Sequence, residues 1–499
     1  MIIRNLLEKG EPSHTALILA DRAITYRELD QQIDQAAAQL RKLGFRKGDR
    51  IGLAFPNGLE MIVTFLAAST VGTAAPLNPA YTRDEFKFYL EDTAARGLIV
   101  PRNGAEEARA AAREINVAVI DCAIDEKGWL QLSSPQALKE TSGDEAIGRE
   151  DIALILHTSG TTSRPKRVPL AHDNLLTSAR NVAHTYQLTA ADVSLCVMPL
   201  FHVHGLVAST LATLETGGTV VVPPKFNPLS FWSTVREHRA TWYSAVPTIH
   251  QVLVSRSKGN RPQGAEQLRF IRSCSASLAP QLMSEIEDTF GVPVLEAYGM
   301  TEAAHQMASN PLPPASRKPG SVGCGTNVEI AILDEAGKEL PPGTIGEVSI
   351  KGANVFAGYE GNAEANAESF SNGWFRTGDQ GQLDSAGYLT LVGRIKELIN
   401  RGGEKISPRE IDEALLAHPA VAEACCFGIP DRMYGEGVAA AVVLKEMATE
   451  KDLIAHCRSS LADFKCPTTI YIMDVIPRTA TGKIQRRNVA AAIASDGLR

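Results

Sequence analysis

Short apolar segments alternate with stretches of helical periodicity along most of this chain, and this alternation restricts the fold more than any other feature. Helical spacing of apolar residues covers 26–43 and 59–69, and the first of these stretches ends at Gly44. Strands that alternate with helices form parallel sheets covered by helices, so we predict an α/β fold. The strand-like apolar segments are 50–55, 117–120, 152–156, 194–198, 219–222, 241–245 and 270–274.

The pattern changes twice towards the C-terminus. From Val328, short strands are separated by turns rich in Gly, Pro and Asp, which predicts a small β-rich part. After Arg394, helices and strands of similar length predict a compact α+β unit. A chain of 499 residues also exceeds the size at which a single hydrophobic core stops growing. The predicted organisation is an N-terminal domain at 1–393 with its β-rich part at about 328–393, a boundary at 394–397, and a small C-terminal domain at 398–499.

The composition argues against several classes of function. Hydrophobic residues make up 44% of the chain and charged residues 21%, which is typical of a globular protein. Lys and Arg number 50 against 57 Asp and Glu, a net charge of −7 without a basic block, so we predict no nucleic-acid partner. No apolar run approaches the ~20 residues of a membrane span, and the N-terminus lacks a signal-peptide pattern. Eight scattered cysteines without a C-x-x-C pair suggest reduced thiols, so we predict a cytoplasmic location.

A loop rich in hydroxyl groups follows the apolar segment at 152–156 and ends in a lysine. Hydroxyls and exposed backbone N–H groups can bind phosphate oxygens, glycine lets the backbone approach closely, and lysine supplies a mobile charge. The loop does not match the Walker pattern, and a loop of this composition is more often an ordinary surface turn. The residues that would bind phosphate are Thr158, Ser159, Gly160, Thr161, Thr162 and Lys166.

Four further motifs accompany this loop, and the set in this order resembles the adenylate-forming superfamily of acyl-CoA synthetases, carrier-protein adenylation domains and luciferases. The resemblance covers nearly the whole chain, from Ile24 to Arg487. It implies that the small C-terminal domain swings about a hinge at 394–397, in which Lys396 matches the hinge residue. The four motifs are YGMTE at 298–302, TGD at 377–379, GRIKE at 393–397 followed by Gly402-Gly403, and TATGK at 479–483.

The resemblance implies a two-step ligase reaction that uses ATP, Mg²⁺ and coenzyme A. A carboxylate attacks the α-phosphorus of ATP to give an acyl-adenylate and pyrophosphate, and a thiol then displaces AMP. Because an anion attacks a polyanion, cations are needed at the moving charge. Lys483 matches the lysine that reaches the carboxylate and the α-phosphate, and Glu302 matches the acid that holds Mg²⁺. The implied catalytic set is Lys483, Glu302, Thr301, Lys166 and His202.

Other residues match positions that contact the nucleotide or coenzyme A. Asp379 matches the acid that accepts both ribose hydroxyls, and Arg394 matches a residue that contacts ribose or phosphate. Tyr298 would stack on the adenine. Taken alone, Glu302 would be read as a helix start, and the segment from Arg401 to Gly403 as a turn between a strand and a helix. The adenine would lie along Ser275, Ala276 and Ser277, and the loop that lines the pantetheine tunnel would be Arg401, Gly402 and Gly403.

One residue departs from the family pattern. The phosphate loop of the family usually reads Pro-Lys-Gly, whereas here Arg167 stands at the glycine position. Glycine there would permit a positive φ, which arginine tolerates poorly. Arg167 is therefore expected either to add a phosphate contact or to strain the loop and slow catalysis, and the sequence leaves both outcomes open.

Three segments that would line the acid pocket resemble the oxalate–CoA ligase branch, close to the 4-coumarate–CoA ligases: 199–205, 270–278 and 296–305. Oxalate carries a second carboxylate beside the reacting one, so its pocket should be small and rich in hydrogen-bond donors. His204, His305 and Ser275 are predicted to supply them, since imidazole can donate to an anion and gain charge. A histidine in isolation is more often a satisfied core residue.

Several alternatives stay open at this point. The acid could be malonate, another short acid or an aryl acid such as 4-coumarate. The protein could also be a stand-alone adenylation domain that loads a carrier protein instead of free coenzyme A. A non-catalytic nucleotide-binding module would be expected to lack Lys483 or Glu302, and both are present. The expected partners are the small carboxylic acid, ATP and coenzyme A, and the protein could be a monomer or a homodimer.

Overall fold

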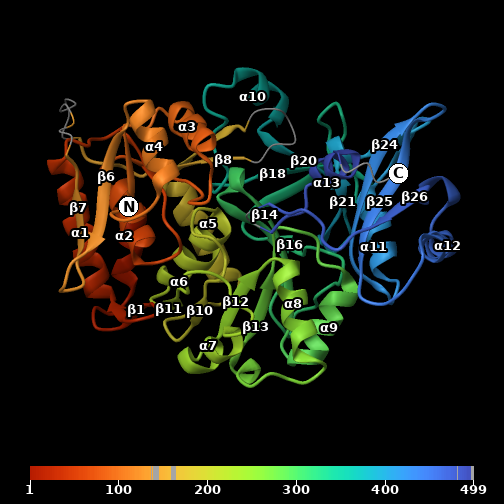
Figure 1. Ribbon diagram of the computed structural model, residues 1–499, viewed down its shortest axis with the longest axis horizontal. Helices are drawn as coiled ribbons and strands as arrows, with labels where there is room; N and C mark the ends of the chain where they lie inside the picture. Colours follow the sequence, from red (N-terminus) through yellow and green to blue (C-terminus); the bar gives the residue numbers. More distant parts are fainter. Residues whose placement is uncertain (136–137, 139–144, 159–164, 480–481, 496–499) are drawn as a thin grey trace.

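The computed structural model describes the chain apart from residues 136–137, 139–144, 159–164, 480–481 and 496–499. The molecule is elongated, with helix-covered sheets at its N-terminal end and a separate small sheet at its C-terminal end (Figure 1). This arrangement confirms the predicted α/β fold with a large N-terminal and a small C-terminal domain. In the described part of the chain, no helix is both long and apolar enough to cross a membrane.

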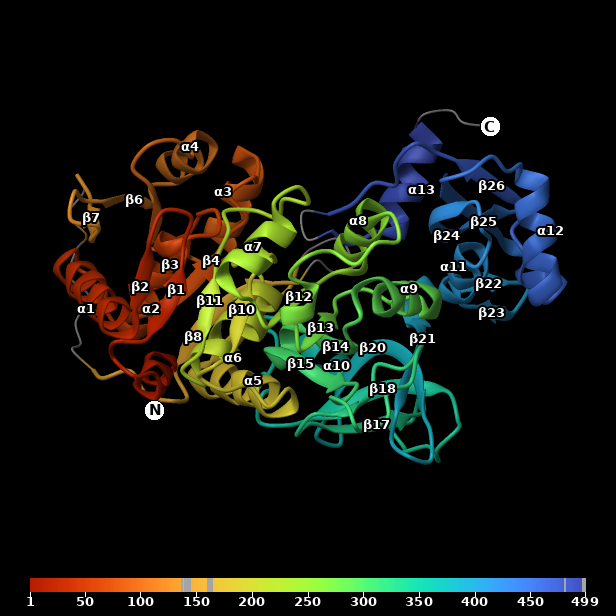
Figure 2. The ribbon, with the colours of Figure 1, turned by 90° about the horizontal axis from the view of Figure 1, so that it is seen from below.

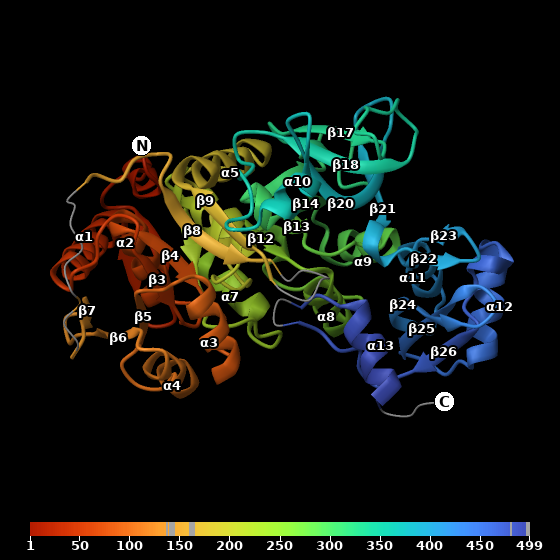
Figure 3. The ribbon, with the colours of Figure 1, turned by 90° about the horizontal axis from the view of Figure 1, so that it is seen from above.

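The first sheet has seven strands in the order β7-β6-β5-β3-β4-β8-β9. Five of them pair in parallel, and only the edge strands β7 and β9 are antiparallel. Helices α1 and α2 pack on one face, and α3 and α4 on the other, each with its own apolar cluster (Figure 3). The bounds are α1 (Tyr26–Lys42), β3 (Arg50–Leu53), α2 (Leu59–Val71), β4 (Thr73–Pro76), α3 (Arg83–Asp92), β5 (Gly97–Pro101), α4 (Glu106–Glu114), β6 (Ala118–Ile124), β7 (Leu130–Ser133), β8 (Ile152–His157) and β9 (Arg167–Ala171).

Helix α1 shows how local sequence defines these elements. The Thr25 side chain accepts a hydrogen bond from the backbone N–H of Glu28, and the Glu28 carboxylate accepts one from the backbone N–H of Thr25, which caps the helix start. The buried face carries Leu29, Ile33 and Leu40 at helical spacing, as the apolar periodicity predicts. The helix thus follows its sequence signals closely.

The second sheet has nine strands in the order β16-β15-β14-β13-β12-β10-β11-β1-β2, and its centre is parallel. Helices α7, α8 and α9 contribute to the apolar cluster on one face, and α5 with the π-helix η2 to the main core. The bounds are η1 (Ile3–Lys9), β1 (Thr15–Ile18), β2 (Ala23–Thr25), α5 (His172–Thr185), β10 (Val193–Leu195), η2 (His204–Leu211), α6 (Ala212–Leu214), β11 (Thr219–Val221), α7 (Phe231–His238), β12 (Trp242–Ala245), α8 (Pro247–Ser257), η3 (Ala265–Gln267), β13 (Phe270–Ser273), α9 (Pro280–Phe290), β14 (Val294–Met300), η4 (Thr301–Ala303), β15 (His305–Ser309) and β16 (Cys324–Gly325).

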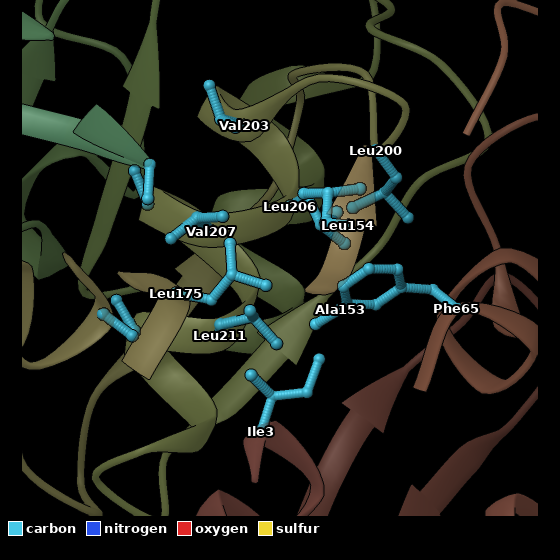
Figure 4. Packing of buried hydrophobic residues seen from close by; sticks show 14 of the residues in the cluster. Ile3, Phe65, Ala153, Leu154, Leu175, Leu200, Val203, Leu206, Val207 and Leu211 are labelled. Atoms are coloured by element: carbon cyan, nitrogen blue, oxygen red, sulfur yellow. The ribbon is translucent and has the colours of Figure 1, made fainter. Parts of the chain in front are cut away.

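One apolar core joins the two sheets. Phe65 from α2 and Leu154 from β8 pack with Leu206 from η2 and Leu175 from α5 (Figure 4). All four side chains are buried. Burial of a side chain of this size stabilises the fold by roughly 1.5–3 kcal/mol relative to leaving it in water. The two sheets therefore form one rigid base for the residues at their edges.

The β-rich part and the C-terminal part each have their own five-stranded sheet. The first is antiparallel, with β17 (Glu329–Leu333), β18 (Gly346–Lys351), β19 (Phe370–Ser371), β20 (Trp374–Leu383) and β21 (Leu389–Arg394), next to α10 (Ala363–Ser369). The turn η5 (Ile395–Glu397) then leads into the five-stranded sheet of the C-terminal part, at the right in Figure 2. Its elements are β22 (Ile399–Arg401), β23 (Glu404–Ile406), α11 (Pro408–Leu416), β24 (Val421–Asp431), β25 (Gly435–Leu444), α12 (Glu450–Ser460), η6 (Asp463–Lys465), β26 (Thr469–Ile472) and α13 (Arg486–Ser495).

Candidate active site

The candidate site lies at the carboxyl ends of strands in the second sheet. Strands β13 and β14 run in parallel, with Ser273 opposite Glu296, and both chain segments leave the sheet at the same edge. Ligands bind at this edge in open α/β sheets. The strip 274–278 follows β13, and the turn η4 follows β14. The chain then returns in β15 with His305 opposite Met300, so the predicted segments meet in one place.

The backbone at this edge is tightly constrained. A Cβ atom on Gly299 would lie 2.0 Å from the carbonyl oxygen of His305, so only glycine fits at this position of the YGMTE motif. Ser275, Ala304 and His305 have positive φ angles of 74°, 50° and 122°, which are unfavourable for residues with a side chain. Such strain persists where the surrounding structure imposes it, and Ser275 and His305 are both residues predicted to contact the substrates.

Asp379 is buried and bound on both sides. Its carboxylate accepts a hydrogen bond from the Tyr298 hydroxyl, and the Arg394 Nε lies 2.8 Å from its Oδ1. The pairing of β20 with β21 places Asp379 directly opposite Arg394, so the sheet register itself creates this ion pair. The charge of Asp379 raises the pKa of Arg394, and burial raises the pKa of the Tyr298 hydroxyl. The three predicted nucleotide-binding residues therefore form one connected group.

Glu302 is buried at the start of the turn after β14. The Tyr359 hydroxyl donates a hydrogen bond of 2.7 Å to its Oε1, and the Lys166 Nζ lies 4.4 Å from the centre of the Tyr359 ring. Burial raises the pKa of Glu302. The pKa of Lys166 is lowered, mainly by burial and to a smaller extent by the charge of Lys396. Among the described residues, no cation lies within ion-pair distance of the Glu302 carboxylate. Such a carboxylate fits a hard cation such as Mg²⁺.

Lys483 enters the site from the C-terminal domain. A tight turn holds it, in which the backbone N–H of Thr479 donates to the Lys483 carbonyl at 2.8 Å. A Cβ on Gly482 would lie 3.3 Å from Val246, just before α8, so the turn touches the N-terminal domain. Burial lowers the pKa of Lys483, and so does the nearby charge of Arg394. The structure thus brings Lys483 close to Arg394, Asp379 and Glu302.

Three predicted acid-binding residues form a second group beside Lys483. The ring of His204 bridges two hydroxyls, with Nδ1 3.0 Å from Ser275 Oγ and Nε2 2.6 Å from Ser244 Oγ. Its ring centre lies 5.1 Å from that of His305. His202 stands just before them and accepts the backbone N–H of His204 at its Nδ1, 3.3 Å away. His204, Ser275 and His305 are therefore brought together as predicted.

These histidines are neutral. Burial, together with the charge of Lys483, lowers the pKa of His202 to about 3. Burial also lowers the pKa of His204 and of His305 well below the usual value, with the charge of Arg272 as the next cause in both. In the protein alone the rings are therefore neutral dipoles, and the expectation that an imidazole gains charge at a bound anion stays a prediction.

Arg272 stands behind this group on β13 and is fully buried. Its Nη1 donates to Ser244 Oγ at 3.0 Å, and its Nη2 lies 3.3 Å from His305 Nδ1. It also donates to the Tyr186 hydroxyl at 2.8 Å and to Gln306 Oε1 at 3.1 Å, and the Cys274 thiol is a further neighbour. None of these partners is an Asp or a Glu.

With this geometry established, comparison with known proteins assigns the family. Residues 7–360 match the family AMP-binding enzyme, and residues 410–483 match the AMP-binding enzyme C-terminal domain. The chain belongs to this family. It is 46% identical over 500 residues to an oxalate–CoA ligase of Arabidopsis thaliana, which covers 98% of this chain and 97% of that protein. It is 44% identical over 510 residues to an oxalate–CoA ligase of Saccharomyces cerevisiae, covering 95% of this chain and 93% of that protein.

A solved structure agrees with the fold over the whole length of this AMP-binding enzyme. ATP-bound MatB from Rhodopseudomonas palustris superposes with a TM-score of 0.89 at 31% identity, covering 99% of both chains. The apo structure of the same protein superposes with a TM-score of 0.78, covering 99% of both chains at 31% identity. The present arrangement is therefore more similar to the ATP-bound form, in keeping with Lys483 inside the site.

Sequence reasoning missed two residues of this AMP-binding enzyme that contact the predicted site. Tyr359 lies in the β-rich part and has no motif around it, so only the fold brings it to Glu302. Arg272 did carry a signal, because a charged residue inside an otherwise apolar strand is expensive to bury without a purpose.

Arg167 does not strain the loop backbone, which was one of the two outcomes expected from the sequence, and the other, a phosphate contact, stays a prediction. It begins strand β9, opposite His157, and its φ is not positive, so it does not strain the backbone. Its Nε lies 3.6 Å from Asp92 Oδ2 and 3.5 Å from Glu360 Oε2, and its guanidinium also donates to the backbone carbonyl of Asp92. The side chain ties the base of the loop to α3 and to the β-rich part.

The remaining predicted residues are placed as follows. The backbone N–H of Thr158 donates to the Lys166 carbonyl at 3.0 Å, which closes the base of the phosphate loop. Ser159, Gly160, Thr161 and Thr162 lie outside the described residues. Ala276 and Ser277 are exposed along the strip, and Thr301 is half-buried in η4. Arg401 is half-buried at the end of β22, and Gly402 and Gly403 form the exposed turn to β23.

Proposed function

We propose that this protein is an AMP-forming acid–CoA ligase that converts oxalate, ATP and coenzyme A to oxalyl-CoA, AMP and pyrophosphate. The observation that carries the proposal is the group formed by His204, His305 and Ser275, which presents several polar contacts beside Lys483. The two oxalate–CoA ligases that match nearly the whole chain support the same acid. A second carboxylate next to the reacting one requires such a polar surrounding, because a buried anion without hydrogen bonds is strongly destabilised.

In the first half-reaction, the acid carboxylate attacks the α-phosphorus of ATP. We propose that Lys483 neutralises the charge that the carboxylate and the α-phosphate share during attack. Its low pKa is consistent with a buried ammonium that becomes fully charged beside two anions. Thr301, at the start of η4, would donate to the α-phosphate, and Lys166 would contact the β- and γ-phosphates from the loop. His202, held by the His204 backbone, would face the reacting carboxylate.

Glu302 would hold Mg²⁺, which supplies positive charge to the phosphates when it is bound. The Tyr359 hydroxyl orients the carboxylate by occupying its Oε1. The ribose would bind at Asp379, where it would replace the Tyr298 hydroxyl as a hydrogen-bond donor. Tyr298 would then be free to contact the adenine along Ser275, Ala276 and Ser277.

The second half-reaction requires a different arrangement of the C-terminal domain. In its sheet, order β23-β22-β25-β24, the Arg401–Gly403 turn lies at one end, and α13 packs on β24 at the other. Lys483, just before α13, occupies the site in the present structure. We propose that the domain at 398–499 rotates about 394–397, with Lys396 as the hinge residue, to bring the turn to the adenylate for attack by coenzyme A. The N-terminal domain at 1–393 would stay fixed.

The test is an assay with the full-length protein. Pyrophosphate release is measured with oxalate, malonate, 4-coumarate and acetate, followed by product analysis after addition of coenzyme A. Oxalyl-CoA as the preferred product supports the proposal. Adenylate without thioester would instead indicate loading of a carrier protein, and preference for an aryl acid would overturn the assignment to oxalate. The eight thiols, none of which forms a disulfide, support a cytoplasmic location, which imaging of the tagged protein would check.

A further inference from the structure

Arg272 is a buried cation without a buried anion. Its side chain is fully buried, and no Asp or Glu of the described part of the chain lies within ion-pair distance of it. The other buried arginines differ in this respect. Arg109 pairs with Asp121 at 2.7 Å, and Arg409 pairs with Glu413 at 2.8 Å. Because a buried charge is retained only when it is paired or used, the missing counter-ion of Arg272 points to an anionic ligand.

The surroundings of Arg272 show where that anion binds. A guanidinium only donates hydrogen bonds, so Ser244 Oγ and His305 Nδ1 must act as acceptors towards it. The His305 proton therefore sits on Nε2, the nitrogen that faces away from Arg272 and lies 4.0 Å from Cys274 Sγ. Ser244 Oγ also contacts Nε2 of His204, and Nδ1 of the same ring contacts Ser275 Oγ. The arginine thus polarises both rings of the predicted acid-binding group.

Other cations near the site already have a task in the proposed reaction. Lys483 faces the reacting carboxylate and Lys166 the phosphates, whereas Arg394 is paired with Asp379. The neutral histidines cannot balance a second negative charge by themselves. Among the residues that the structure describes, Arg272 is the cation that contacts the acid-binding group and has no such task, and Tyr186 and Gln306 hold it on its far side.

We propose that Arg272 is the positioning residue that makes the site selective for acids with a second anionic group. It acts through the Nε2–H of His305, and through Ser244 and His204 on Ser275, so that polarisation strengthens the hydrogen bonds that His305 and Ser275 would donate to the anion. This inference rests on the proposed function and names the physical origin of its specificity. The ligand class is a short acid whose distal group is negatively charged, and an equally sized neutral group at that place is rejected.

The experiment compares pairs of acids that differ in one charge. Oxalate and its monoamide oxamate form one pair, and malonate with malonamate forms the second. The variants are Arg272→Gln, which removes the charge, and Arg272→Lys, which keeps it. Arg269→Gln is the matched control, because Arg269 lies three residues earlier and is paired with Asp192 at 2.5 Å. The kcat and KM for each acid are obtained from pyrophosphate release, and stability from thermal unfolding.

The expected result is a selective loss. In Arg272→Gln, kcat/KM for oxalate should fall roughly 10–100-fold, the usual effect of losing a hydrogen bond to a charged group, mostly through KM. Oxamate should change little, so the preference for the dianion collapses. The melting temperature should stay unchanged or rise, since an unpaired buried charge has been removed. Arg272→Lys should recover part of the preference, and Arg269→Gln should keep it entirely.

Equal losses for oxalate and oxamate, together with a lower melting temperature, would show that Arg272 is merely structural. If Arg272→Gln does not fold, Ser244→Ala provides the second variant, because it cuts the contact between Arg272 and His204 with a small change. It should weaken the dianion preference without affecting oxamate. Failure of wild-type protein to use oxalate contradicts the proposed function, and the malonate pair then tests the arginine. Wild-type preference for the neutral member of both pairs overturns the inference itself.

Discussion

The phosphate side and the acid side of this site manage charge in opposite ways. On the phosphate side, Asp379 is paired with Arg394 and Glu302 is bound by Tyr359, so each acid already has a partner that a ligand can replace. On the acid side, neutral histidines surround a guanidinium that has no counter-ion. The first arrangement suits a nucleotide that binds and leaves together with its own metal cation. The second is completed only by a ligand that brings a negative charge.

This comparison predicts that loss of Lys483 has the largest effect on the reaction rate of any substitution, because Lys483 is proposed to contact both the acid carboxylate and the α-phosphate. Lys483→Ala should slow adenylate formation by about 100–1,000-fold, the loss typical of one removed transition-state donor. Given preformed acyl-adenylate, the same variant should make the thioester at a near wild-type rate, because the proposed rotation of the C-terminal domain takes the lysine out of the site before the thiol attacks. Single-turnover assays of each half-reaction check this.

The reciprocal variant provides the control for that prediction. Gly403 has a φ of 96° and is exposed in the Arg401–Gly403 turn, so Gly403→Val should harm only the thiol step. Equal damage to both half-reactions by Lys483→Ala would contradict the two-pose mechanism.

The next effect concerns the acid side alone. His305→Ala removes the donor that Arg272 holds in position, so KM for oxalate should rise by roughly 10–100-fold, equivalent to about 1.5–3 kcal/mol. Larger acids should be affected less, because they do not place a carboxylate there. His172→Ala is the control, since His172 is also fully buried but binds the backbone N–H of Ile3 far from the site. Steady-state kinetics across the acid panel decide the matter, and unchanged oxalate KM would remove His305 from the pocket.

The sequence predicts those features of the two sides that depend on local motifs, and it does not predict contacts between distant segments. The YGMTE and TGD motifs identify Tyr298 and Asp379, and strand alternation correctly predicts the sheets beneath them. The bond between these two residues could not be predicted, because it depends on how the β-rich sheet packs against β14. Arg272 was visible as a charge in an apolar strand, but its lack of an acid becomes apparent only in three dimensions.

Arg167 should give a smaller effect, although it departs from the family pattern. Its side chain is 23% exposed, and its guanidinium lies between the carboxylates of Asp92 and Glu360. Arg167→Gly should lower the free energy of unfolding by about 1 kcal/mol or less, as expected for partly exposed ion pairs. KM for ATP and the adenylation rate should change only a few-fold. Chemical denaturation and adenylation kinetics check both, and a large rise in KM for ATP would show that Arg167 contacts phosphate after all.

The smallest expected effect is the sharpest test of the acid side. Burial and Arg272 lower the pKa of His305 and His204 well below 6.5, so both stay neutral as the pH varies between 6 and 8. A charged histidine that held oxalate would instead lose its proton as the pH rose through its pKa, and KM for oxalate would climb by up to tenfold per pH unit. If Arg272 supplies the charge, KM for oxalate should stay flat over this range, because a guanidinium does not titrate there. In Arg272→Gln the histidines no longer face that cation, so their pKa should rise and oxalate binding should improve towards acidic pH. A KM for oxalate that rises steeply with pH in the wild-type protein would show that a charged imidazole, and not Arg272, balances the second carboxylate.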